Sequence, residues 1–203
     1  MRSHNYFKIL FVFLIFGLCS ASGVAQLRYG FRLGGDFAAT RLTDAEGYSL
    51  VNKSGFSGGL ILEYQFSKNG FAPDIGLLYG RHNTRLRYEN NNPFGFGRNF
   101  IDIPIHLKYK FWLKPTHNTV APLVYAGPTF SFKLDHKGSQ PLDTKIFQPT
   151  VEVGIGFDIV NFIQITAGYH FGIGNAVKSF DMLPDARITT NGWNLSANLL
   201  FDF

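Results

Sequence analysis

The chain has 203 residues, enough for one domain with a sizeable interior. Aromatic residues make up 16% of it, with 22 phenylalanines, while charged residues also make up only 16%, against about 25% in an average soluble protein. The formal net charge of +5 comes from basic residues that interleave with acidic ones, which excludes the basic stripe of a nucleic-acid-binding protein. Beyond the N-terminus there is no run of about 20 apolar residues, so a helical membrane protein is excluded as well.

Residues 1–25 predict a cleaved signal peptide. Two basic residues precede a short apolar stretch at 9–18, and small residues precede Gln26, the expected first residue of the mature chain. An anchoring helix is one alternative, but the stretch is shorter than the ~17–25 residues that a spanning helix needs. Lipidation of Cys19, the single cysteine, is another, although the residues before it are not the small ones that such a site requires. We therefore expect residues 26–203 to form one domain without a thiol, a disulfide or a Cys-based metal site.

From Gln26 onward, apolar residues recur with a period of two, as in the stretch FIDIPIHLKYKF at 100–111. Strands of a transmembrane barrel alternate in this way between lipid-facing apolar side chains and lumen-facing polar or small ones. The sequence therefore predicts an all-β fold, an eight-stranded antiparallel up-and-down transmembrane β-barrel. Pro104 lacks the N–H of a ladder hydrogen bond, so we expect a β-bulge there. The expected strands are 27–37, 56–66, 71–85, 100–111, 123–134, 150–159, 163–172 and 193–203, and the mixed pattern of the fifth leaves its register open.

The expected connections alternate in length. Those after the second, fourth and sixth strands are short, and those after the odd-numbered strands are long and polar. Bacterial outer-membrane barrels place short turns in the periplasm and long loops outside, with aromatic residues near both strand ends. The pattern predicts an integral protein of the outer membrane of a Gram-negative bacterium. A soluble lipocalin-like barrel is the alternative, and it would turn its apolar face inward. The short connections are 67–70, 114–120 and 160–161, and the long ones are 40–54, 83–98, 135–146 and 173–190.

The strand at 100–111 and the following PLVYAGPTFSF resemble the PorT-like outer-membrane β-barrel family. Its members share an x-[IL]-P-[IL]-x-[IL]-K-Y strand and then a Y-x-G-P strand. The matching positions are Ile103, Pro104, Ile105, Leu107, Lys108, Tyr109, Tyr125, Gly127 and Pro128. The resemblance implies an outer membrane protein β-barrel domain and, from the role of the family's namesake, a link to type IX protein secretion. The terminal Phe203 resembles the C-terminal aromatic residue that the barrel-assembly machinery reads.

The polar face of the expected strands carries charges of both signs, which predicts a network of side chains inside the lumen. Eight strands enclose an interior just wide enough for side chains to fill, and buried charges need paired partners. We therefore expect a closed barrel in which Glu63 and Glu152 pair with Lys or Arg. The expected network consists of Arg28, Arg32, Glu63, Asp102, His106, Lys108, Glu152, Gln164, His170 and Asn194.

Other chemistry finds less support in the sequence. Arg85, Arg87 and Arg98 fall in a long loop, where we expect them to contact lipopolysaccharide phosphates. His106 and His170 could act as a base or a metal ligand, but no histidine pair with ligand spacing accompanies either, and a place in the lumen network is the favoured interpretation. The sequence therefore predicts no catalytic residue, metal site or cofactor.

These observations favour a non-enzymatic outer-membrane barrel with a structural or accessory role. The expected partners are outer-membrane lipid and lipopolysaccharide, the barrel-assembly machinery and components of a secretion system. One alternative is a small-solute or ligand-binding barrel, or a narrow porin, that uses the long loops. Another is a lipid-modifying enzyme at the barrel rim, which the apolar outward positions disfavour.

Overall fold

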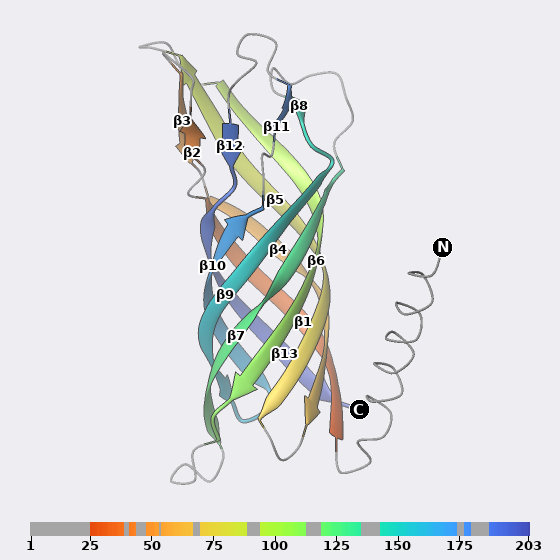
Figure 1. Ribbon diagram of the computed structural model, residues 1–203. Coiled ribbons are helices and arrows are strands. Elements are labelled where there is room, and N and C mark those ends of the chain that lie inside the picture. Colours follow the sequence, from red (N-terminus) through yellow and green to blue (C-terminus); the bar gives the residue numbers. More distant parts are fainter. Residues whose placement is uncertain are drawn as a thin grey trace, which may run out of the picture.

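Eight long strands close into a barrel, and short strands lie near one end of it (Figure 1). The computed structural model describes residues 25–38, 41–43, 48–52, 54–66, 70–88, 94–112, 119–134, 143–173, 177–179 and 187–203. The barrel strands are β1 (Ala25–Ala38), β4 (Ser54–Phe66), β5 (Phe71–Tyr88), β6 (Phe94–Lys110), β7 (Val120–Lys133), β9 (Phe147–Ile159), β10 (Ile163–Gly172) and β13 (Gly192–Asp202). The short strands are β2 (Arg41–Thr43), β3 (Tyr48–Asn52), β8 (Asp143–Thr144), β11 (Val177–Ser179) and β12 (Arg187–Thr189). No helix in this part of the chain is long and apolar enough to cross a membrane.

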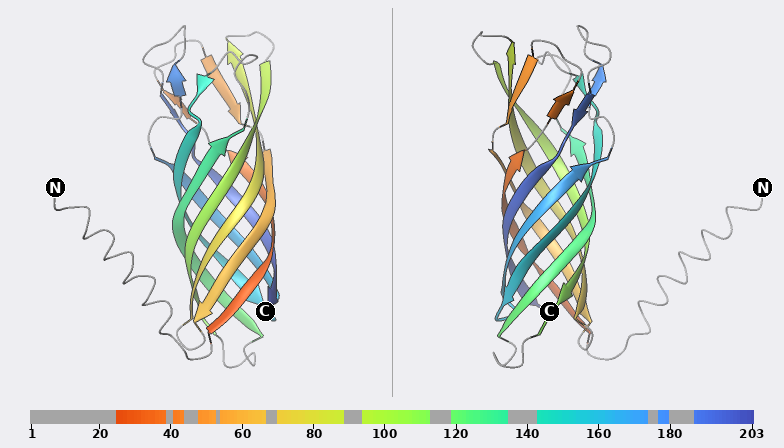
Figure 2. Two further views of the ribbon diagram at one scale, coloured as in Figure 1. Left: turned by 90° about the vertical axis from the view of Figure 1, so that its right-hand side faces the viewer. Right: turned by 60° about the vertical axis from the view of Figure 1, so that its left-hand side comes forward.

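Each barrel strand pairs antiparallel with the strands before and after it, so the predicted up-and-down topology is confirmed. The barrel closes where the first and last strands meet, with Arg28 opposite Asp202 and Ala38 opposite Gly192. The strands are strongly tilted relative to the barrel axis (Figure 2). Closure leaves no barrel strand with an unpaired edge, the condition that a sheet must meet inside a bilayer.

The alternation of side chains is reversed relative to a soluble barrel. In β1, Arg28 is fully buried and Arg32 is 7% exposed, while their neighbours Phe31 and Leu33 are 53% and 69% exposed. The other barrel strands follow the same rule, so the outer wall is apolar and the interior is largely polar. The buried apolar cluster inside is small and consists of Ile61, Leu78 and Leu200. This inverted burial fits a barrel surrounded by lipid and is opposite to the lipocalin-like alternative.

The two ends of the barrel differ. One end, called here the turn end, carries the C-terminus and the tight β9–β10 hairpin, where Val160 and Asn161 have φ angles of 57° and 56°. Positive φ at both residues is typical of a type I′ turn, and Ile159 lies opposite Ile163, so the connection predicted at 160–161 is short as expected but extends over residues 160–162. The opposite end, the loop end, carries the short strands, in the pairs β2–β12 and β8–β11 and with β3 on β5 (Figure 2).

Aromatic side chains contact one another near both ends. Tyr29 lies 4.8 Å from Phe203 between ring centroids at the turn end, and Tyr169 lies 4.8 Å from Trp193 toward the loop end. Such girdles mark the two interfaces of a bilayer.

The long connection predicted at 83–98 is wrong in extent, whereas those at 40–54 and 173–190 separate barrel strands as predicted and also contain the short strands β2, β3, β11 and β12. The β5–β6 ladder continues to Leu86 opposite Phe94, and β3 adds to the far side of β5. Residues 83–88 alternate arginines with Thr, Leu and Tyr, a strand-compatible pattern that their polarity concealed. Residues 1–24 of the predicted signal peptide lie outside the described residues, and Ala25 begins β1.

The bulge predicted at Pro104 is also wrong. The β5–β6 register is the same on both sides of it, with Ile75 opposite Ile105 and Leu78 opposite Asp102. The β6–β7 register is unchanged as well. A proline removes one N–H, and here the ladder tolerates that loss without an inserted residue.

Candidate functional site: the barrel lumen

The part of the lumen near the turn end is filled by charged side chains in direct contact. Lys110 Nζ lies 2.6 Å from Glu63 Oε1 and 2.8 Å from Asp158 Oδ2, and Arg28 NH1 reaches the same two oxygens at 3.1 and 3.2 Å. Lys108 Nζ lies 2.8 Å from Glu63 Oε2. These five side chains are at most 1% exposed, so the charges are compensated by one another rather than by bulk water.

Side-chain amides add further hydrogen bonds to these ions. Gln164 Nε2 donates to Glu63 Oε2 and to Asp158 Oδ2, both at 2.9 Å, while its Oε1 accepts from Lys108 Nζ at 2.8 Å. Gln65 Oε1 accepts from Lys110 Nζ at 3.0 Å. These amides satisfy part of the donors and acceptors that the buried ion pairs leave, while Arg28 NH2 and Asp158 Oδ1 have no hydrogen-bond partner among the described residues.

A second tier of contacts lies above these ions, toward the loop end. Arg32 NH2 lies 2.9 Å from Asp74 Oδ2, which also lies 2.7 Å from Lys108 Nζ, and Arg32 Nε donates to Asn198 Oδ1 at 2.8 Å. We call the whole group the inner cluster: Arg28, Arg32, Glu63, Gln65, Asp74, Lys108, Lys110, Asp158, Gln164 and Asn198. Its four cations face the three buried carboxylates and the half-exposed Asp202, whose Oδ1 lies 3.4 Å from Arg28 Nε, so the charges balance.

His106 and Tyr125 mark the boundary of the inner cluster. His106 Nδ1 lies 3.4 Å from Asp74 Oδ1, and His106 Nε2 lies 3.8 Å from Glu152 Oε2. The Tyr125 hydroxyl donates to Glu152 Oε1 at 2.6 Å. The ring of Tyr125 lies against Gly154 and Gly168, where a side chain would collide with it. Glu152 thus contacts a tyrosine and a histidine, whereas Glu63 pairs with Lys and Arg as predicted.

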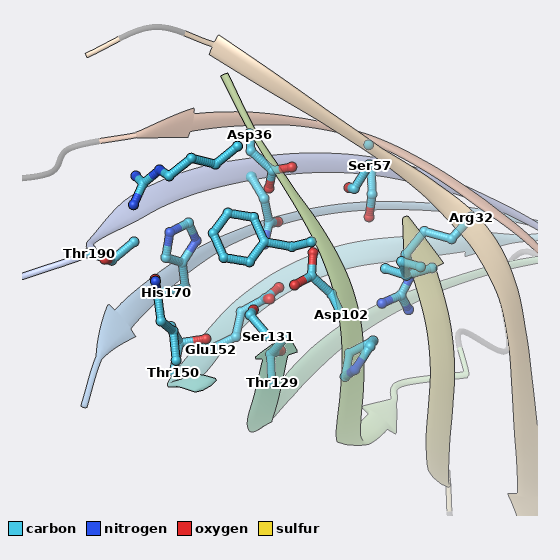
Figure 3. A pocket seen from close by; sticks show the side chains of 18 residues that line it. Arg32, Asp36, Ser57, Asp102, Thr129, Ser131, Thr150, Glu152, His170 and Thr190 are labelled. Atoms are coloured by element: carbon cyan, nitrogen blue, oxygen red, sulfur yellow. The ribbon is translucent and has the colours of Figure 1, made fainter. Parts of the chain in front are cut away.

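Beyond this boundary the lumen contains a cavity of about 100 Å³, called here the outer cavity. This volume has room for several water molecules. Figure 3 shows Asp102 among its walls, with Arg32 on one side and His170 and Thr190 on the other. Six of the 18 lining residues carry a short hydroxyl side chain. Its residues are Arg32, Gly34, Asp36, Ser57, Leu78, Arg98, Phe100, Asp102, Pro104, Thr129, Ser131, Gln148, Thr150, Glu152, His170, Thr190, Asn194 and Ser196.

The residues predicted for the lumen network divide between these two regions. Arg28, Arg32, Glu63, Lys108 and Gln164 belong to the inner cluster. The others are at the boundary or around the outer cavity: Asp102, His106, Glu152, His170 and Asn194.

Several network residues were missing from the prediction. Lys110, Asp158 and Asp74 lie on the polar face of their strands, so alternation alone identifies them. Tyr125 could not be found in this way, because the register of its strand was open. In the structure Leu123 and Tyr125 point inward and Val124 is exposed.

Arg98 does not support the predicted contact with lipopolysaccharide. It is 5% exposed and lines the outer cavity, with its guanidinium carbon 5.8 Å from the centroid of the Phe100 ring. The cause is the extension of β6, which makes residue 98 an inward position of a strand instead of a loop position. The side chains of Arg85 and Arg87 lie outside the described residues.

The comparisons agree with this architecture. Residues 20–178 match the family described as outer membrane protein beta-barrel domain, and the chain belongs to that family. It is similar in fold to the outer membrane protein OprG from Pseudomonas aeruginosa, with a TM-score of 0.59 at 9% identity over 87% of this chain and 96% of that one. The Neisserial surface protein A also matches, with a TM-score of 0.48 at 15% identity over 86% and 97% of the two chains. The comparison with curated proteins gave no match. The protein is therefore an integral outer-membrane β-barrel.

Proposed function

We propose that the protein is a closed, non-enzymatic barrel with a structural or accessory role at the outer membrane. The inner cluster is the observation that carries this proposal. Its side chains come from β1, β4, β5, β6, β9, β10 and β13, so they meet across the lumen from opposite walls. A solute that crossed the barrel would have to separate ion pairs that have no bulk water to replace them.

Recordings in planar bilayers test closure. Purified wild-type protein should give no steady, large single-channel current. The matched variant Lys110→Ser shortens the side chain that joins Glu63 and Asp158, and it should conduct more than the wild type in reconstituted samples that show the same heat-modifiable mobility. Steady, large currents from the wild type would contradict the proposal.

The absence of catalysis is part of the same proposal. A rim enzyme needs a histidine beside Ser or Glu on the lipid-facing surface, whereas His106 is buried and His170 lines the outer cavity. Incubation of the reconstituted protein with radiolabelled lipopolysaccharide and phospholipid should leave both unmodified.

The accessory role includes a proposed link to type IX secretion. Its support is the PorT-like pattern of β6 and β7, in which Lys108 belongs to the inner cluster and Tyr125 to its boundary. Mild crosslinking and pull-down from native outer membranes should recover secretion components. Recovery of lipopolysaccharide and assembly factors alone would remove the secretion link and leave the closed barrel intact.

Recognition by the assembly machinery rests on Phe203. Phe203 is 84% exposed, and its N–H donates to Leu27 O at 3.2 Å, so its ring is accessible directly after the end of β13. Deletion of Phe203 should lower the yield of folded protein in cells and leave refolding into detergent micelles unchanged.

A ligand-binding barrel is the second candidate function. The outer cavity favours this function. Because the inner cluster closes the lumen toward the turn end, a ligand can reach the cavity from the loop end alone. The narrow-porin alternative would need the inner cluster to open, and the conductance experiment separates the two.

A further inference from the structure

We propose that the outer cavity binds a small organic cation with a primary ammonium group, held by the carboxylate of Asp102. This inference deepens the ligand-binding role and rests on the proposed closure of the lower lumen. The ligand enters from the loop end and stops at the boundary formed by His106 and Tyr125.

The first argument is an unsatisfied acceptor. Asp102 is 7% exposed and lines the cavity, and its Oδ1 has no hydrogen-bond partner among the described residues (Figure 3). Thr129 Oγ1, on another wall of the same cavity, also has none in that part of the chain. A buried carboxylate oxygen without a donor costs free energy, and such a group in a native protein requires an explanation. A donor from outside the protein supplies one.

The second argument is the charge of the walls. Asp36, Asp102 and Glu152 all line the cavity. Of the two arginines in its walls, Arg32 is paired with Asp74 in the inner cluster, so the basic groups that the three carboxylates face in this lining are Arg98 and His170. The inner cluster balances its charges together with Asp202 at the turn end, whereas the outer cavity carries an excess of negative charge. A cation completes that balance.

The third argument concerns the kind of cation. An ammonium group offers three donors and no acceptor, which suits walls of carboxylates and hydroxyls. Leu78, Phe100 and Pro104 add an apolar part to the lining, against which a short carbon chain can pack. Among the described residues no group of three His, Cys, Asp or Glu side chains is placed to hold a metal ion. The geometry thus favours a short alkylammonium over a divalent metal.

Nuclear magnetic resonance titration of the reconstituted protein with ethylammonium tests the proposal. Wild-type protein should show saturable shifts at residues around the outer cavity, and tetramethylammonium, which has no N–H donor, and acetate should not reproduce them. Asp102→Asn keeps the shape of the side chain and removes its charge, and it should weaken ethylammonium binding by at least about tenfold, as loss of a charge-assisted hydrogen bond implies. Asp202→Asn, the same change at the turn end outside the cavity, should bind as the wild type does.

Two results would overturn the inference: no saturable shifts with ethylammonium, or equal binding by Asp102→Asn and the wild type. Heat-modifiable mobility on gels confirms that each variant is folded. Conductance measured on the same preparation keeps the two proposals apart. Absent binding in a non-conducting barrel overturns the cation site alone, whereas large currents overturn the closed lumen on which it rests.

Discussion

The inner cluster and the outer cavity lie in one lumen and are built from the same strands, yet one is filled and the other is hollow. The difference is the length of the inward side chains. Near the turn end, Arg28, Lys108 and Lys110 reach across the barrel to carboxylates on other strands. Toward the loop end, seven of the 18 residues that line the outer cavity are Gly, Ser or Thr, whose side chains stop short of the axis.

This contrast shows that strand number sets how wide a lumen is, and side-chain length sets whether it is closed. Eight strands leave an interior that side chains can just fill. In the inner cluster, long Lys and Arg side chains fill this interior, and their ion pairs take the place of solvent. Short hydroxyl side chains leave space in the outer cavity, so polar atoms there depend on water or a ligand. The two regions should therefore lose different amounts of stability when a polar group is removed.

The largest effect is expected in the inner cluster. Lys110→Met keeps most of the side-chain volume but leaves Glu63 and Asp158 without one of their shared cations. Removal of one partner of a buried ion pair costs about 3–5 kcal/mol, so the free energy of unfolding should fall by that amount. Urea unfolding in lipid vesicles measures it.

Lys145→Met is the matched control, because Lys145 is exposed. Surface substitutions of this kind usually change stability by no more than about 0.5 kcal/mol. If the two variants unfolded at the same urea concentration, the inner cluster would not be the stabilising feature described here.

The boundary should give a smaller effect. Glu152→Ala removes the nearer acceptor of the Tyr125 hydroxyl and leaves it only the long contact to Asn194 Oδ1 at 3.5 Å, which costs about 1–3 kcal/mol. Its thermal midpoint in detergent should fall between those of the wild type and Lys110→Met. Glu46→Ala, in the predicted loop at 40–54 and outside the described residues, should change the midpoint less. A midpoint for Glu152→Ala above that of Glu46→Ala would contradict the assignment of Glu152 to the boundary.

The sequence predicted which side chains face inward better than it predicted which of them meet. Strict alternation placed Arg28, Glu63 and Lys108 inside, because a strand has two faces and one of them must be apolar in lipid. The partners of each charge depend on how far neighbouring strands are shifted along the barrel, and that shift is not written in any single strand. Glu152 therefore contacts Tyr125 and His106, although Lys and Arg were the expected partners. The full length of β5 and β6 was not predicted for a different reason. Where these strands extend beyond the bilayer they are polar, so they lack the apolar face by which a strand is recognised in the sequence.

The smallest effect, and the sharpest test of the comparison, is expected in the outer cavity. Thr129→Val replaces a hydroxyl that has no hydrogen-bond partner among the described residues by a methyl group of similar size, so unfolding should change by no more than about 0.5 kcal/mol. Thr166→Val is the same substitution where the hydroxyl is bonded, 2.7 Å from Ser196 Oγ, and it leaves that serine without its partner. The expected cost there is about 1–3 kcal/mol. Urea unfolding of both variants, in the same lipid and without added amines, gives the difference directly. Equal losses would show that the Thr129 hydroxyl is held as firmly as that of Thr166, and would contradict its description as a hydroxyl without a hydrogen-bond partner.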